Sequence, residues 1–133
     1  MKNISKIQRA FLTLIKETSF NKFEGKKIYK DLIKYSNLWK GVVFGRFFNR
    51  ELIILRDLPE GIYNADTIFI SIPTKHLSTF KKIIEKWNPT EINIITLSPQ
   101  QSYRVSVNIR LDLFKIWGST DTGDLSIIKL WWD

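Results

Sequence analysis

The sequence contains no cysteine and a single histidine, His76. Without cysteine the chain can form neither a disulfide nor a thiolate metal site, and one histidine cannot assemble a typical transition-metal centre. The absence of cysteine also fits an intracellular protein, because disulfides belong mainly to oxidising compartments. We therefore expect no metal, no cofactor and a cytoplasmic location.

Glycine, proline and long apolar runs are scarce as well. Six glycines and four prolines in 133 residues argue against a linker or a low-complexity segment. The longest apolar stretch, Gly41 to Phe48, is interrupted by Arg46, so no window approaches the roughly 18 apolar residues of a membrane-spanning helix. The first residues contain no uninterrupted apolar run either, so we expect no signal peptide and no membrane partner.

What the chain does have is enough apolar material for a core. Hydrophobic residues make up 44%, including nine Phe, five Trp and four Tyr, while charged residues are an ordinary 26%. This length predicts one compact domain over residues 1–133. A possible subdivision falls near the turn at 58–66, giving a basic helical lobe over 1–57 and a β-α-β unit with antiparallel strands over 58–133. The oligomeric state is left open.

Positive charge is concentrated in the first part of the chain. Residues 1–50 contain 12 Lys/Arg and 3 Asp/Glu, a net of +9, whereas residues 51–133 contain 9 and 10, a net of −1. Such an asymmetry indicates a polyanionic partner: nucleic acid, an anionic membrane or an acidic protein surface.

Two amphipathic helices are predicted within this basic part. Apolar residues recur three and four positions apart between Ile4 and Leu14, which predicts a helix over 4–18 with Asn3 as its N-cap. A loop over 19–25 and a second helix over 26–36 follow, and residues 36–38 form a short turn.

The segment 39–50 can be interpreted in two ways. As a helix it places Trp39, Val43 and Phe47 on one face. As a strand it alternates, but Arg46 interrupts the alternation, while two glycines weaken the helix. We favour the helix.

The pattern of residues 51–133 predicts mainly strands. Strands are predicted over 52–55, 67–72, 91–97, 103–113 and 125–132, a helix over 75–87, a turn over 58–61 and a loop over 119–124. If the strands 67–72 and 91–97 pair as parallel neighbours, their crossover should be right-handed. The predicted fold class is α+β: a basic three-helix N-terminal lobe, with a winged helix-like arrangement as one option, packed with a mostly antiparallel sheet and one covering helix.

Three helices followed by two strands is the order of a winged helix, in which the helix after the turn enters the major groove. Lysine ammonium groups on the second helix would hold the phosphate backbone, and guanidinium or amide groups after the turn would contact base edges or phosphates. The predicted nucleic-acid-binding residues are Lys26, Lys27, Lys30, Lys34, Lys40, Arg46, Asn49 and Arg50. Against this interpretation, the hairpin that would form the wing carries the acidic residues Glu60 and Asp66, whereas a wing that touches the phosphate backbone should be basic. The plain alternative is a small helical lobe with a solvated lysine face.

Further candidates carry weaker signals. Arg104 and Arg110 lie on the polar side of the strand 103–113, which could bind single-stranded nucleic acid, although an ordinary wet sheet face is the simpler interpretation. Of the neighbouring residues Trp131 and Trp132, one should be buried, and the other could be covered or could anchor an interface. His76 is most simply a residue at a helix start.

The acidic residues Asp57, Glu60 and Asp66 could hold Mg²⁺ for phosphodiester cleavage. They lie in a turn, however, where acidic residues are common for local hydrogen bonding. We therefore predict that the chain has no catalytic residue and is not an enzyme.

The resulting expectation is a small intracellular nucleic-acid-binding protein without catalytic activity, with DNA favoured over RNA as the ligand. The small size and the Lys-, Ile- and Asn-rich composition favour a regulator carried by a mobile element. One alternative is a protein-binding modulator, such as a phage- or mobile-element-encoded inhibitor or a small subunit of a nucleoprotein complex, that meets an acidic or nucleoprotein partner. The second alternative is a metal-dependent nuclease.

Overall fold

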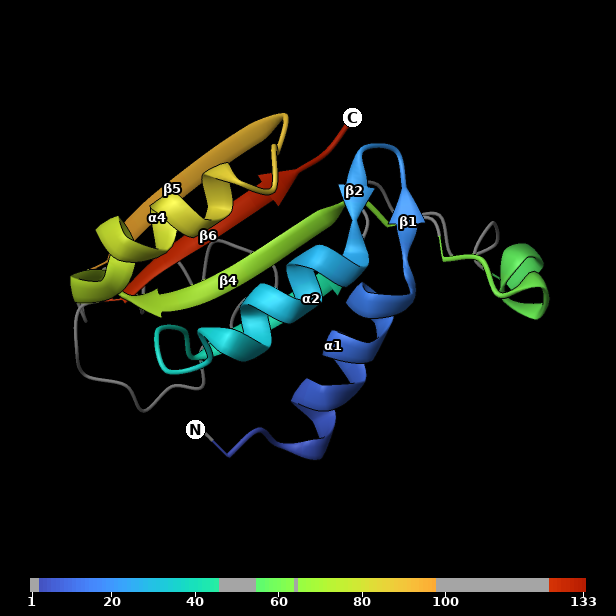
Figure 1. The fold of residues 1–133 in the computed structure, drawn as a ribbon, viewed down its shortest axis with the longest axis horizontal. Helices are drawn as coiled ribbons and strands as arrows, with labels where there is room; N and C mark the ends of the chain where they lie inside the picture. The colour runs from blue at the N-terminus through green and yellow to red at the C-terminus, as the bar shows by residue number, and fades with distance from the viewer. Residues whose placement is uncertain (1–2, 46–54, 64, 98–124) are drawn as a thin grey trace.

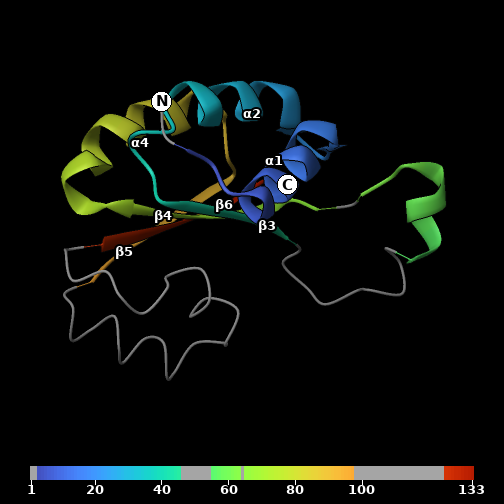
Figure 2. The ribbon, with the colours of Figure 1, turned by 90° about the horizontal axis from the view of Figure 1, so that it is seen from below.

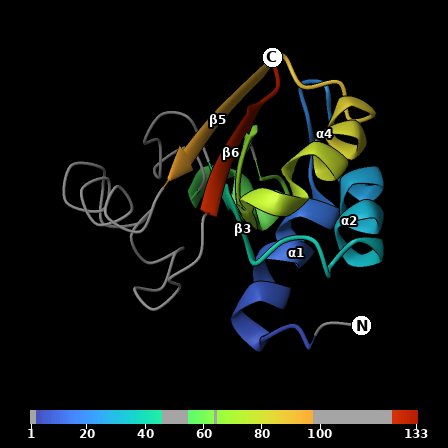
Figure 3. The ribbon, with the colours of Figure 1, turned by 90° about the vertical axis from the view of Figure 1, so that its left-hand side faces the viewer.

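The computed structural model describes residues 3–45, 55–63, 65–97 and 125–133. Its main feature is a four-stranded sheet of β3 (Gly41–Gly45), β4 (Thr67–Pro73), β5 (Glu91–Leu97) and β6 (Leu125–Trp131) in the order β3-β4-β6-β5. All neighbouring strands are antiparallel. The helices α1 (Lys6–Glu17), α2 (Gly25–Lys34) and α4 (Leu77–Glu85) cover one face of this sheet (Figures 2 and 3). The α+β class, the antiparallel sheet and the covering helix are thus confirmed.

Helix α1 begins two residues later than its apolar spacing predicts. Ser5, not Asn3, is the N-cap, and its hydroxyl accepts a hydrogen bond of 3.1 Å from the backbone N–H of Gln8. This bond satisfies a backbone donor that the first turn of a helix leaves free. Leu12 and Ile15 form the buried side of the helix.

A small hairpin joins α1 to α2, where we predicted a loop over 19–25. Its strands are β1 (Ser19–Phe20) and β2 (Phe23–Glu24), and Asn21 in the turn has a positive φ of 55°. Strands of two residues are too short to show an alternating pattern, which explains why the sequence did not reveal them. Phe23 is buried, so the hairpin carries an aromatic ring into the core.

The prediction of a helix over 39–50 is wrong for residues 41–45, which form β3. Val42 and Phe44 are buried against the helices, and Val43 lies opposite Phe69 of β4 on the other face. Side chains alternate between the two faces of a strand, so this short apolar run serves both faces. Residues 46–50 lie outside the described residues. The three-helix, winged helix-like arrangement is therefore not confirmed.

The predicted strands 67–72, 91–97 and 125–132 are confirmed as β4, β5 and β6. The predicted helix 75–87 is seen as α4 preceded by a 3-10 turn, η2 (Thr74–His76). Strands β4 and β5 are not neighbours, because β6 lies between them and pairs with both. The parallel neighbour pairing that we considered is therefore absent from the described sheet.

Four further predicted elements lie next to or within the residues that the structure does not describe. The turn 58–61 is confirmed as η1 (Leu58–Glu60), closed by Gly61 with a φ of 74°. Of the predicted strand 52–55, Leu55 is helical and the remaining residues lie outside the described ranges. The strand 103–113 and the loop 119–124 also lie outside them.

The core lies between the sheet and the helices and draws on both parts of the chain. Its cluster of buried side chains includes Leu12 and Ile28 as well as Ile68 and Ile128. Trp132 is fully buried, donates a 2.9 Å hydrogen bond from its indole to the carbonyl of Trp87, and packs edge-on against Phe23. The last described strand and the N-terminal hairpin are therefore joined by side-chain packing.

Candidate nucleic-acid interface

Helix α2 carries the lysines that the sequence singled out. Its inner side buries Ile28 and Leu32, so the helix turns its polar side away from the sheet. Lys26, Lys30 and Lys34 follow at every fourth position on that outer side, and all three are exposed. The predicted lysine stripe is therefore present on the surface.

Two of the four predicted lysines of α2 have contacts of their own. The ammonium group of Lys27 donates a 2.7 Å hydrogen bond to the backbone carbonyl of Lys86, just after α4. The ammonium group of Lys34 lies 5.3 Å from the centre of the Tyr35 ring. Lys27 thus links α2 to α4, while Lys34 covers an aromatic ring and keeps its charge at the surface.

The residues predicted to follow the turn are placed differently from a recognition helix. Lys40 is exposed directly before β3, and its backbone N–H donates a 2.8 Å hydrogen bond to the carbonyl of Ser71 in β4. Its backbone is therefore bonded to the sheet at the start of β3. Arg46, Asn49 and Arg50 lie outside the described residues.

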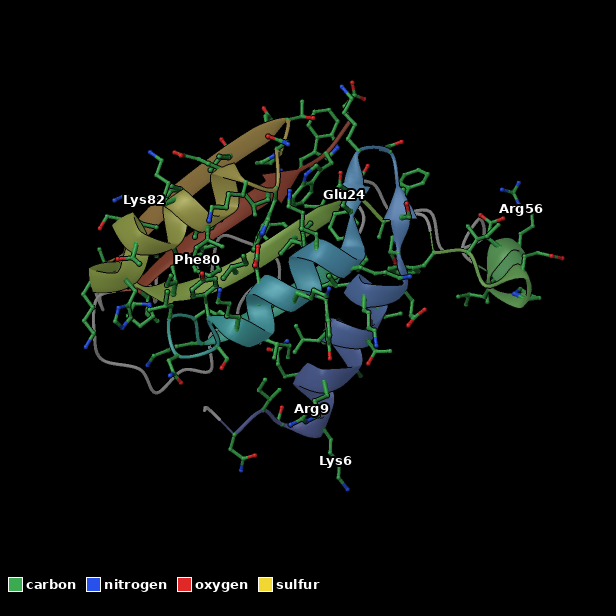
Figure 4. The ribbon with its side chains drawn as sticks, viewed as in Figure 1. Lys6, Arg9, Glu24, Arg56, Phe80 and Lys82 are labelled. Carbon is green, nitrogen blue, oxygen red and sulfur yellow. The ribbon has the colours of Figure 1, made fainter. Side chains whose placement is uncertain are left out.

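Lysines of η2 and α4 form a second stripe that sequence reasoning missed. Lys82 in α4 and Lys86 directly after it are four positions apart, which places them on one side of the helix, and Lys75 precedes them in η2. All three are exposed (Figure 4 labels Lys82). The net charges of residues 1–50 and 51–133 did not reveal these lysines, because residues 51–133 also contain ten acidic residues. Their helical spacing was the signal that could have revealed them.

The two stripes lie on neighbouring helices. Besides the bond from Lys27, the indole of Trp87 donates a 2.8 Å hydrogen bond to the carboxylate of Asp31 in α2. Both contacts tie α2 to the residues just after α4, and the two helices cover the same face of the sheet in Figures 2 and 3. The tertiary structure thus joins lysines that are about fifty residues apart in sequence into one surface.

This surface holds most of the net charge. Residues 25–34 and 74–86 contain eight lysines and two acidic residues, a net of +6 out of +8 for the chain. One of the two acids, Asp31, accepts the bond from Trp87. Between pairs of described residues the one ion pair is Arg56–Asp57, at 2.9 Å, outside these helices. No described carboxylate therefore forms an ion pair with the lysines of α2 and α4.

A hollow of about 530 Å³ lies where α1 ends and α2 begins. Its charged lining residues are Lys16, Glu17, Glu24, Lys26 and Lys27. Two carboxylates here stand against three ammonium groups, so this hollow is less one-sided in charge than the outer surface of α2 and α4.

Two of the three acidic residues considered as metal ligands have local partners, and the third, Glu60, is exposed in η1. Asp57 pairs with Arg56, and its hydrogen bond and charge raise the pKa of that guanidinium. Asp66 accepts hydrogen bonds from the Thr67 hydroxyl at 3.0 Å and from the Trp131 indole at 3.3 Å. Among the residues that the structure describes, no three His, Asp or Glu side chains come together in a way that could hold a metal ion.

The remaining candidates are placed as follows. His76 is half-buried at the end of η2, directly before α4. Trp132 is the buried tryptophan of the pair, and Trp131 is half-buried with its indole on Asp66. Arg104 and Arg110 lie outside the described residues. Across the described ranges, no helix has the length and apolar character needed to cross a membrane.

Comparison with known proteins adds no further information. No family model matches the chain, and no curated protein or solved structure shows significant similarity to it. The candidate interface therefore rests on the chemistry and geometry of this chain.

Proposed function

We propose that this protein binds nucleic acid through its helical layer, by contacts of lysine side chains with the phosphate backbone. The observation that supports this is the net charge of +6 on residues 25–34 and 74–86, which form α2, η2, α4 and the residue directly after α4. A surface of one sign attracts a polyanion over a long range and favours contacts with its phosphates. DNA is the first ligand to test.

A salt titration tests the proposal. Fluorescence anisotropy with labelled duplex DNA, duplex RNA and single-stranded DNA should show binding at about 50 mM salt that weakens steeply by about 200 mM. Each neutralised phosphate lowers the slope of log affinity against log salt by about 0.9 on duplex DNA. Absence of binding at the lower salt concentration, or binding insensitive to salt, would contradict the proposal.

The proposal includes no chemistry on the bound nucleic acid. The absence of a cleavage step from the proposal is supported by Asp57 and Asp66, because both carboxylates already accept hydrogen bonds from neighbouring side chains. Purified protein should leave labelled DNA and RNA intact with Mg²⁺ or Mn²⁺. Cleavage that requires the metal and disappears in Asp66→Ala would replace the binding function with that of a nuclease.

A protein-binding modulator is the second candidate, and a specific observation favours it. Leu55, Leu58 and Ile62 are 64%, 48% and 47% exposed, in a segment that stands away from the sheet and helices in Figure 1. Exposed apolar side chains in one segment are typical of protein contacts. Failure of the protein to bind any nucleic acid would favour this function.

A further inference from the structure

We infer that the lysine stripes of α2 and of η2–α4 act together on the backbone of double-stranded nucleic acid and bind it without regard to base sequence. This inference rests on the proposed function and names its substrate class. It departs from the sequence-based expectation, which placed the contacts in the first fifty residues and expected base recognition after the turn.

The first argument is the shape of the charged surface. The stripe from Lys26 to Lys34 spans eight residues, or about 12 Å of helix. Helix α4 covers the same face of the sheet as α2 (Figure 3), and the bond from Lys27 to the Lys86 carbonyl joins the two, so the lysines of α4 form a second row beside the first. Double-stranded DNA presents two rows of phosphates flanking its grooves, about one charge per 1.7 Å of axis. A two-row array of ammonium groups complements two phosphate rows better than one extended strand.

The second argument concerns what is missing for single-strand binding. Proteins that bind single strands use exposed aromatic rings on which bases stack. On α2 and α4, Phe80 is buried and Tyr29 has the Lys16 ammonium group 5.3 Å from its ring centre; the Lys34 ammonium group lies 5.3 Å from the ring centre of Tyr35, directly after α2. This surface therefore offers charge without a free stacking ring.

The third argument concerns base recognition. Base edges are read mainly by Arg, Lys, Asn and Gln. The helices α2 and α4 contain no Arg, Asn or Gln. Lysine can contact guanine, but its ammonium group is a single flexible charge without the planar fork of Arg. The array is thus better equipped for the phosphate backbone than for reading a base sequence.

The test compares three double variants that each remove two positive charges. Lys26→Gln/Lys30→Gln changes the α2 stripe, and Lys82→Gln/Lys86→Gln changes the α4 stripe. Lys6→Gln/Arg9→Gln is the control, because both residues lie toward the far end of α1 from Lys82 (Figure 4). All six side chains are exposed, so folding should be retained, and circular dichroism checks it.

Both stripe variants should reduce the magnitude of the salt slope on duplex DNA by about 2, one unit for each lost phosphate contact, and the control should change it less. Affinity for duplexes of unrelated sequence should be equal, and affinity for single strands weaker. If duplex binding persists and the α4 variant behaves like the control, the inference fails while the proposed function stands. Preference for one sequence or for single strands also overturns the inference. Absence of all binding overturns both.

Discussion

Gly25 lies where the end of α1 meets the start of α2, and its missing side chain is what lets them meet. A Cβ built at this position would stand 2.0 Å from the carbonyl oxygen of Ile15 and 2.2 Å from that of Thr18. Its N–H donates a 3.1 Å hydrogen bond to the same Thr18 oxygen. Both neighbouring atoms belong to the backbone, so a rotamer change cannot relieve the contact.

Gly25→Ala should therefore destabilise the fold by about 1–3 kcal/mol or more, the usual cost of overpacking. Gly45→Ala is the matched control, because a Cβ there meets no atom of the described residues within 4 Å, and it should change stability by about 0.5 kcal/mol or less. Urea unfolding followed by circular dichroism measures both. Equal stabilities of the two variants would show that α1 and α2 can move apart without cost.

At the scale of elements, the outer edge of β3 is closed by one side chain. The carboxamide of Gln8 in α1 donates a 2.7 Å hydrogen bond to the carbonyl of Val42 and accepts one of 3.0 Å from its N–H. Edge strands with free backbone groups invite pairing with other chains. Gln8 thus imitates a neighbouring strand at this residue and fixes α1 against the sheet.

Gln8→Ala should lower the free energy of unfolding by about 1–2 kcal/mol, because it leaves a partly buried donor and acceptor without their partner. Thr13→Ala on the same helix is the control, since the exposed Thr13 hydroxyl bonds only within α1. Unfolding in urea gives the stabilities, and light scattering reports association through the edge. If the Gln8 and Thr13 variants are equally stable, water replaces the carboxamide at no cost.

At the scale of the whole molecule, the shared core predicts cooperative unfolding. Side chains from residues before and after the turn at 58–66 belong to one buried cluster. We expect unfolding curves from far-ultraviolet circular dichroism and from tryptophan fluorescence to coincide, as for a single domain. Two separate transitions would instead support the subdivision into 1–57 and 58–133.

Trp132 is the side chain that best tests this coupling. Trp132→Phe removes the indole bond to Trp87 and part of the packing on Phe23, and should cost about 1–3 kcal/mol. Trp131→Phe should cost less, because Trp131 is only half-buried. Thermal melts compare the two, and a larger loss for Trp131→Phe would argue against this role of Trp132.

The sequence by itself determined the elements whose pattern is long and local. Apolar residues three and four apart predicted α1, α2 and α4, and β-branched runs next to proline or glycine predicted β4, β5 and β6. The lysine stripe of α2 was predicted for the same reason, since residues four apart share a helix face regardless of tertiary contacts.

Only the tertiary structure decided the rest. The run Gly41–Gly45 is too short to distinguish a helix from a strand, and pairing with β4 makes it β3. The lysines of α4 belong to residues 51–133, which have a net charge of −1, yet the contacts of Lys27 and Asp31 with the residues just after α4 bring them next to the lysines of α2. Charge along a chain follows from sequence, but charge on a surface depends on which elements pack side by side.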